Sequence, residues 1–112
     1  MINVFEVIDK TNRIIYLTNE RYKHIAAHPD MQNKINLIKD TLENPLKILD
    51  YALEEDIKYY YRYYKDERSK AKYLRVIVKY LNGIGFIITA YFVENIKWKE
   101  KWYCIMMKRQ IF

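Results

Sequence analysis

The two histidines of the sequence, His24 and His28, are four residues apart. On an α-helix this spacing places both rings on one face, with Glu20 one turn earlier. Histidine titrates near neutral pH, so the pair suits general acid–base catalysis. A solvated helix face, or a charge at the helix C-terminus, explains the same spacing. This spacing can also supply two zinc ligands, but a zinc site needs a third or fourth and no further histidine or cysteine cluster offers one. We therefore expect no metal and no cofactor.

A second group of polar residues, Lys79, Thr89 and Tyr91, interrupts the apolar runs of residues 72–93. Lysine brings a positive charge, threonine a hydrogen-bond donor, and tyrosine a hydrogen bond or a stacking surface. Together they suit an oxyanion or phosphate site. In the alternative, Lys79 extends from the end of its strand into solvent and Thr89 is an ordinary strand former.

Two arginines, Arg62 and Arg75, are candidate substrate-binding residues that would contact phosphate. Arg62 lies within a run of tyrosines, and charge and position alone select it. Cation–π packing against tyrosine rings is the alternative role of both arginines.

The strands that must position these side chains meet at residues 82–85, Asn-Gly-Ile-Gly, which is the strongest hairpin signal in the chain. A two- or four-residue loop places Thr89 and Tyr91 on the opposite face from Lys79. A three-residue loop places Lys79 opposite Thr89, and we favour it because Gly85 then takes the left-handed position of a G1 bulge. The residues that then share one face are Arg75, Lys79, Thr89 and Tyr91. The residues left for the helix side are Leu74, Val76, Val78, Tyr80, Ile88 and Ala90.

The rest of the chain is expected to flank this hairpin. Thr18 is a plausible N-cap for a first helix that Pro29 stops, and an apolar stripe from Met31 predicts a second helix. The expected elements are strands 2–8 and 13–17, helices 19–28 and 29–44, strands 46–49 and 57–64, the hairpin 72–93 and a last strand 102–107. This order predicts one α+β domain over residues 1–112, with two N-terminal helices packed on a mostly antiparallel sheet.

The overall composition limits the class of partner. Among 112 residues, 20 Lys and Arg outnumber 14 Asp and Glu, giving a net charge of +6, and there are 12 tyrosines. A basic, tyrosine-rich surface suits RNA, although small domains of other functions are often equally basic. No apolar run is long enough to span a membrane, so we expect no membrane partner. The single cysteine, Cys104, cannot form an internal disulfide, which favours the cytoplasm.

Three segments of the chain read IIYLTNERYKHIAAHPDM, TLENPLKIL and YLRVIVKYLNGIGFIITAYF. They resemble the phage- and toxin-associated nucleases of the barnase–EndoU–colicin–RelE (BECR) superfamily, and the similarity covers roughly residues 13–93. The resemblance implies two helices against a curved antiparallel sheet with the active site in the groove of the sheet. It also implies that the catalytic residues are His24, His28, Lys79, Thr89 and Tyr91.

The function expected from this resemblance is that of a toxin-like, metal-independent endoribonuclease. Such an enzyme cleaves RNA by attack of the 2′-hydroxyl on the adjacent phosphate, with a histidine as base or acid and Lys79 neutralising the phosphorane. The alternatives are a non-catalytic RNA- or ribosome-binding module and a structural protein that uses its tyrosine face for a partner. The resemblance further implies an acidic antitoxin or immunity protein as a partner.

Overall fold

The computed structural model describes residues 3–51, 53–65, 67 and 70–96, and the expected last strand 102–107 lies outside them. Within these residues six strands form one sheet of order β1-β2-β6-β5-β4-β3, with two α-helices and one 3₁₀ turn, η1. The elements are β1 (Asn3–Ile8), β2 (Ile14–Thr18), α1 (Asn19–Ala26), η1 (Pro29–Met31), α2 (Ile35–Glu43), β3 (Lys47–Asp50), β4 (Ile57–Tyr63), β5 (Tyr73–Leu81) and β6 (Ile84–Val93). The α+β class is therefore confirmed.

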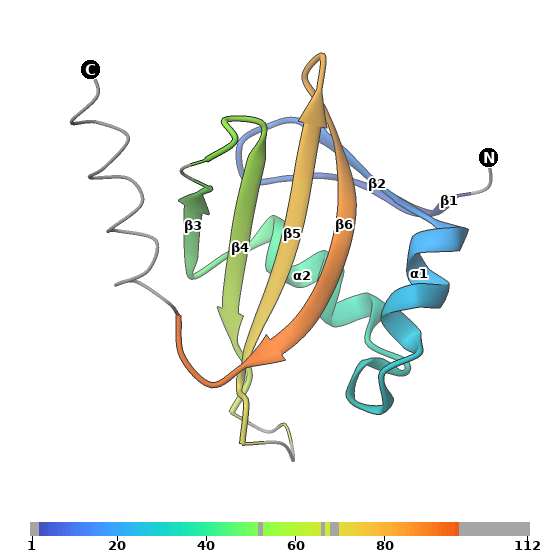
Figure 1. The fold of residues 1–112 in the computed structure, drawn as a ribbon, viewed down its shortest axis with the longest axis vertical. Helices are drawn as coiled ribbons and strands as arrows, with labels where there is room; N and C mark the ends of the chain where they lie inside the picture. The colour runs from blue at the N-terminus through green and yellow to red at the C-terminus, as the bar shows by residue number, and fades with distance from the viewer. Residues whose placement is uncertain (1–2, 52, 66, 68–69, 97–112) are drawn as a thin grey trace.

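The sheet is mixed. Its antiparallel pairings are β1 with β2, β6 with β5, β5 with β4, and β4 with β3, while β2 pairs with β6 in parallel. Figure 1 shows α2 crossing behind the central strands. No helix formed by the described residues is long and apolar enough to cross a membrane.

The first helix begins as the sequence predicts. Thr18 caps α1, because its hydroxyl oxygen accepts a hydrogen bond from the Arg21 backbone N at 3.2 Å. The helix ends at Ala26, and His28 has an extended backbone with φ of −81° and ψ of 130°. Pro29 explains this conformation, since a proline disfavours the helical region for the residue before it. His28 is thus outside the helix that carries His24.

The second helix starts later than predicted. Pro29 opens only the short turn η1, and Asn33 follows with a left-handed φ of 59°. A left-handed residue interrupts a right-handed helix, so α2 begins at Ile35 and the expectation of one helix from Pro29 was wrong. Met31 is still buried in the core, as its apolar stripe suggested.

The central hairpin turns through two residues. Asn82 has φ of 55° and Gly83 has φ of 80°, and Leu81 pairs with Ile84 across them. Positive φ at both central positions is typical of a type I′ turn, which Asn-Gly favours. The three-residue loop expected from the sequence is therefore wrong.

A β-bulge in β6 then changes the register. Val78 pairs with Ile87, but the next residue of β5, Ile77, pairs with Thr89, so Ile88 is the extra residue. The bulge reverses which face the rest of β6 presents. Ile87 precedes the bulge and lies opposite Val78 because of the two-residue turn, so it is buried on the helix side at 2 % exposure. The expectation that Ile88 lies on that side was wrong.

Gly85 is explained by packing rather than by a turn. A Cβ on Gly85 would lie 2.8 Å from Ile15 Cγ1, 2.9 Å from Tyr80 Cε1 and 3.0 Å from Val78 Cγ1. These distances are shorter than van der Waals contact, so only glycine lets β2 approach β6 this closely.

One hydrophobic core lies between the helices and the sheet. The sheet face that lines it is called the inner face here, and the opposite face the outer face. Ile25 of α1 and Leu42 of α2 pack in the same cluster as alternate residues of β5. The buried residues of this core are Phe5, Val7, Ile15, Leu17, Ile25, Met31, Ile38, Leu42, Tyr60, Leu74, Val76, Val78, Tyr80, Ile87 and Ala90.

Candidate functional site

The outer face carries four of the residues selected from the sequence. Side chains alternate along a strand, so Arg75 and Lys79 of β5 point away from the core that holds Val76 and Val78. The paired residues of β6 share their face. The selected residues on the outer face are therefore Arg75, Lys79, Thr89 and Tyr91.

The bulge produces this grouping, not the turn expected from the sequence. A two-residue turn alone would place Thr89 and Tyr91 on the inner face, and the extra residue Ile88 returns them to the outer face. Thr89 lies opposite Ile77, and Tyr91 lies opposite Arg75. Lys79 is paired with Phe86, so the expected opposition of Lys79 and Thr89 was wrong.

Arg75 is the most enclosed charged residue of this face, at 7 % exposure. Its Nε donates a hydrogen bond to the Tyr61 hydroxyl at 2.9 Å, and its Nη1 donates to the Tyr91 hydroxyl at 2.8 Å. Its guanidinium carbon lies 5.3 Å from the ring centroids of Tyr59 and Tyr61 and 5.4 Å from that of Tyr91. The arginine is thus enclosed by three tyrosines, which is the cation–π role considered for it.

The charge of Arg75 has no carboxylate partner within the described residues. Burial by itself lowers the pKa of Arg75, but the interactions with Tyr91 and Tyr61 outweigh it and the pKa is raised. The guanidinium therefore stays charged and adds positive potential to the outer face. Because it is buried, it acts mainly by holding the Tyr91 hydroxyl.

Next to this group lies an aromatic pair that the sequence analysis did not select. Tyr16 of β2 stacks on Phe86 of β6, with ring centroids 5.8 Å apart and an angle of 28° between the planes. Phe86 also pairs with Lys79, so a cation flanks the two rings. Both rings are half-buried, and Lys79 forms no ion pair in the described part of the chain. The signal that could have revealed Tyr16 is its alternation with the buried Ile15 and Leu17.

The histidines lie elsewhere. Helix α1 packs against the inner face through Ile25, whereas Lys79 and Thr89 point from the outer face. His24 and His28 are both exposed, and they do not share one helical face because His28 follows the end of α1. Packed layers are roughly 10 Å apart, so the structure does not bring the imidazoles together with Lys79 and Thr89.

Arg62 is also on the inner side of its strand. It pairs with Leu74, a core residue, and its Nε lies 2.8 Å from the Asp40 carboxylate of α2. Its Nη1 donates to the Asn44 backbone oxygen at 2.6 Å. These contacts satisfy the C-terminal end of α2 and fix it to β4. Because side chains alternate along β4, Arg62 does not lie on the outer face. The run of tyrosines around Arg62 did not reveal this.

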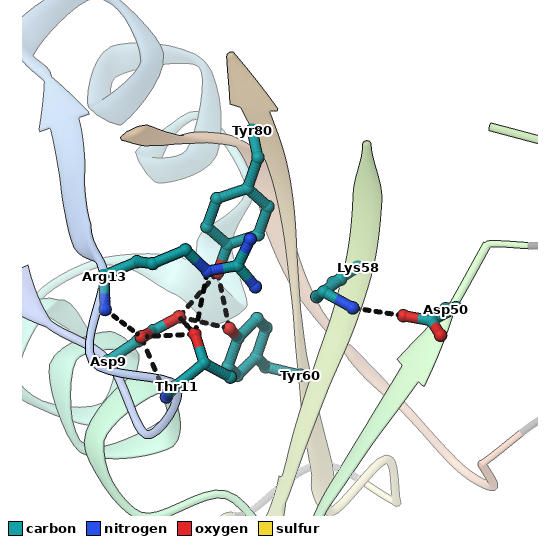
Figure 2. Close-up of polar contacts among 7 residues, drawn as sticks. All are labelled: Asp9, Thr11, Arg13, Asp50, Lys58, Tyr60 and Tyr80. Carbon is teal, nitrogen blue, oxygen red and sulfur yellow. Dashed lines mark hydrogen bonds and ion pairs between the residues drawn. The ribbon is translucent and has the colours of Figure 1, made fainter. Parts of the chain in front are cut away.

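A buried polar cluster, hereafter the Asp9 cluster, was not predicted (Figure 2). Asp9 is 5 % exposed, and its carboxylate accepts hydrogen bonds from the backbone N atoms of Thr11 and Arg13, both at 2.9 Å, and from the Thr11 hydroxyl at 2.7 Å. It also accepts from the hydroxyls of Tyr60 and Tyr80, the latter at 2.6 Å. Asp9 lies between the two predicted strands 2–8 and 13–17, but nothing in the sequence indicated its contact with the two distant tyrosines.

The protonation states of the cluster follow from burial and these bonds. Burial by itself raises the pKa of Asp9, but the hydrogen bonds from Tyr60, Tyr80 and the turn outweigh it and lower the pKa below 3.8. Burial, followed by the bond to Asp9, raises the pKa of Tyr60 to about 12 and raises that of Tyr80 as well. At neutral pH the cluster therefore holds one carboxylate and two protonated phenols.

No group of three or more His, Cys, Asp or Glu in the described ranges is arranged to hold a metal ion. Comparison with protein-family models, with curated proteins and with solved structures gave no match. The resemblance to the BECR superfamily therefore stays a prediction from the sequence.

Proposed function

We propose that the chain binds single-stranded RNA on the outer face of its sheet. The observation that carries this proposal is the grouping of Lys79, Thr89 and Tyr91 with the stacked rings of Tyr16 and Phe86 on that face. Aromatic rings stack unpaired bases, and a neighbouring cation and hydroxyls bind the phosphates. An RNA duplex hides the faces of its bases, so an aromatic surface favours single strands.

The two cations of this face contribute to RNA binding in different ways. Arg75 and Lys79 are four residues apart on β5, which corresponds to about 13 Å at the usual rise of a strand. Lys79 contacts a phosphate directly, while Arg75 contributes through its field and through Tyr91. The net charge of +6 adds long-range attraction for RNA.

A second candidate function is metal-independent cleavage of the bound RNA by 2′-hydroxyl transesterification, as in a toxin-like endoribonuclease. The common face of Lys79, Thr89 and Tyr91 favours it, because a phosphorane needs positive charge and hydrogen-bond donors. Lys79 neutralises the phosphorane, Thr89 donates to a non-bridging oxygen and Tyr91 positions the phosphate. His24 and His28 take no part in this version, since they lie on the other side of the sheet. Solvent water therefore takes the proton of the attacking 2′-hydroxyl and returns one to the departing 5′-oxygen.

One experiment separates the two candidates. Labelled single-stranded RNA is incubated with the protein in EDTA and analysed on native and denaturing gels. A band shift without cleavage supports the binding module, and products ending in a 2′,3′-cyclic phosphate support the nuclease. The double variant His24→Ala/His28→Ala is expected to retain either activity. If RNA does not bind in a salt-dependent manner, the proposal fails.

The proposed partners and location follow from charge and from the resemblance. If the chain is a toxin-like nuclease, the cell has to restrain it, so the resemblance implies an acidic antitoxin or immunity protein that covers the outer face. The single cysteine favours the reducing cytoplasm.

A further inference from the structure

The hairpin of β1 and β2 is attached to the rest of the sheet by a short interface. Strand β2 meets β6 only through the pairs Ile15–Gly85 and Tyr16–Phe86. The second of these pairs is the stacked aromatic pair of the outer face. The position of Tyr16 therefore depends on what holds the hairpin in place.

The turn of this hairpin extends across the inner face beyond β6. The Asp9 carboxylate in the turn accepts hydrogen bonds from Tyr80 of β5 and Tyr60 of β4, which are the next two strands of the sheet. Figure 1 shows the turn behind these strands. Two further contacts fix it: the guanidinium of Arg13 lies 3.7 Å from the centroid of the Tyr80 ring, and the backbone N of Lys10 donates to the Leu42 oxygen at 3.2 Å.

Within the turn, the two carboxylate oxygens bind different partners. Oδ1 accepts from the Thr11 and Arg13 backbone N atoms and closes the turn. Oδ2 accepts from the Tyr60 and Tyr80 hydroxyls and joins the turn to β4 and β5. The same carboxylate therefore closes the hairpin turn and binds that turn to β4 and β5 (Figure 2).

We propose that Asp9 is a positioning residue that holds β2 so that Tyr16 stacks on Phe86. The hairpin is fixed by the Asp9 cluster, by Gly85, where the absence of a Cβ admits Ile15, and by core side chains of both strands such as Phe5 and Leu17. When the Asp9 cluster is lost, the pairing with β6 and the core side chains still hold the hairpin, but the Asp9 carboxylate no longer binds its turn to β4 and β5. Tyr16 then leaves Phe86, although Asp9 lies on the other side of the sheet. The expected loss of RNA affinity rests on the proposed function, but the expected movement of Tyr16 away from Phe86 does not.

The test compares ring contacts and RNA affinity in the same variants. In Asp9→Asn we expect the nuclear Overhauser contacts between the Tyr16 and Phe86 rings to weaken or vanish, while those between β4 and β5 remain. Single-stranded RNA is expected to bind at least about 5-fold more weakly, the lower end of the loss of one stacked base. The matched control is Asp50→Asn, which removes an exposed aspartate that pairs with Lys58 (Figure 2). It is expected to change neither measurement.

A milder variant guards against global unfolding. Tyr80→Phe keeps the ring that packs on Arg13 and removes only the hydroxyl that binds Asp9. Unchanged Tyr16–Phe86 contacts in both Asp9→Asn and Tyr80→Phe would overturn the proposal, and so would an equal loss in Asp50→Asn. If the ring contacts are lost while RNA affinity stays the same, the positioning role stands. The role of the ring pair in RNA binding is then refuted.

Discussion

Replacing Asp9 by asparagine tests how much the Asp9 cluster stabilises the fold. The carboxylate accepts from two backbone N atoms, the Thr11 hydroxyl and two tyrosine hydroxyls. Asparagine keeps one acceptor oxygen for the turn and presents an NH₂ group to the tyrosines, whose hydroxyls can rotate to accept from it. The loss is therefore the difference between charge-assisted and neutral hydrogen bonds at two tyrosines.

This difference is about 1 kcal/mol per bond, so we expect Asp9→Asn to lower the free energy of unfolding by about 2 kcal/mol. Asp9→Ala leaves the buried donors without a partner and is expected to lose about 4 kcal/mol. Urea unfolding followed by circular dichroism measures both values. The exposed Asp50→Asn is the control and should stay within about 0.5 kcal/mol of the wild type. If Asp9→Asn lowers the free energy of unfolding by less than about 0.5 kcal/mol, the hydrogen bonds of Asp9 do not stabilise the fold as proposed.

Acid provides a second measurement on the same cluster. The pKa of Asp9 is lowered in the folded protein, so its contribution is fully present above its ordinary pKa of 3.8 and is lost as pH falls through the folded pKa. The difference in unfolding free energy between the wild type and Asp9→Asn should therefore shrink below pH 3.8. A difference that stays constant with pH would show that the charge of Asp9 does not matter.

Substitutions at three further positions test other parts of the structure by thermal or urea unfolding. Gly85→Ala places a Cβ within 2.8 Å of Ile15 Cγ1 and should destabilise the fold by about 1–3 kcal/mol; an unchanged stability would contradict the close approach of β2 and β6. Thr18→Ala removes the cap of α1 and should cost about 1 kcal/mol, while Thr18→Ser should restore most of it. Arg62→Gln breaks a half-exposed contact with Asp40 and should cost at most about 1 kcal/mol without changing RNA affinity; weaker RNA binding would place Arg62 in the site after all.

The sequence predicted the elements well where a local signal determines them. The Asn82-Gly83 dipeptide marks the hairpin, and Thr18 marks the start of α1. The second glycine, Gly85, led to a wrong prediction of the hairpin register, because close contact with Ile15 of β2 requires it and the turn does not. The bulge at Ile88 has no local signal either, and it restored the grouping that the wrong loop had predicted.

The candidate site was harder to predict, because it depends on which face of the sheet each strand presents. The face of Arg62 is set by its pairing with Leu74, and the position of α1 relative to Lys79 is set by the packing of Ile25. Both are contacts between residues that are far apart in the sequence. The attachment of Asp9 to Tyr60 likewise joins residues that are far apart in the chain, so no pattern near Asp9 could indicate it.

The central claim, that RNA binds on the outer face, is tested most directly by a matched pair of lysine variants. Lys79→Ala removes a cation of the outer face, and Lys23→Ala removes the same charge from the exposed surface of α1 on the other side. Affinity for single-stranded RNA is measured over a range of salt concentrations. The account predicts that Lys79→Ala weakens binding and lowers the salt slope by about one, while Lys23→Ala changes neither. Equal effects of the two variants, or an effect of Lys23→Ala alone, would contradict it.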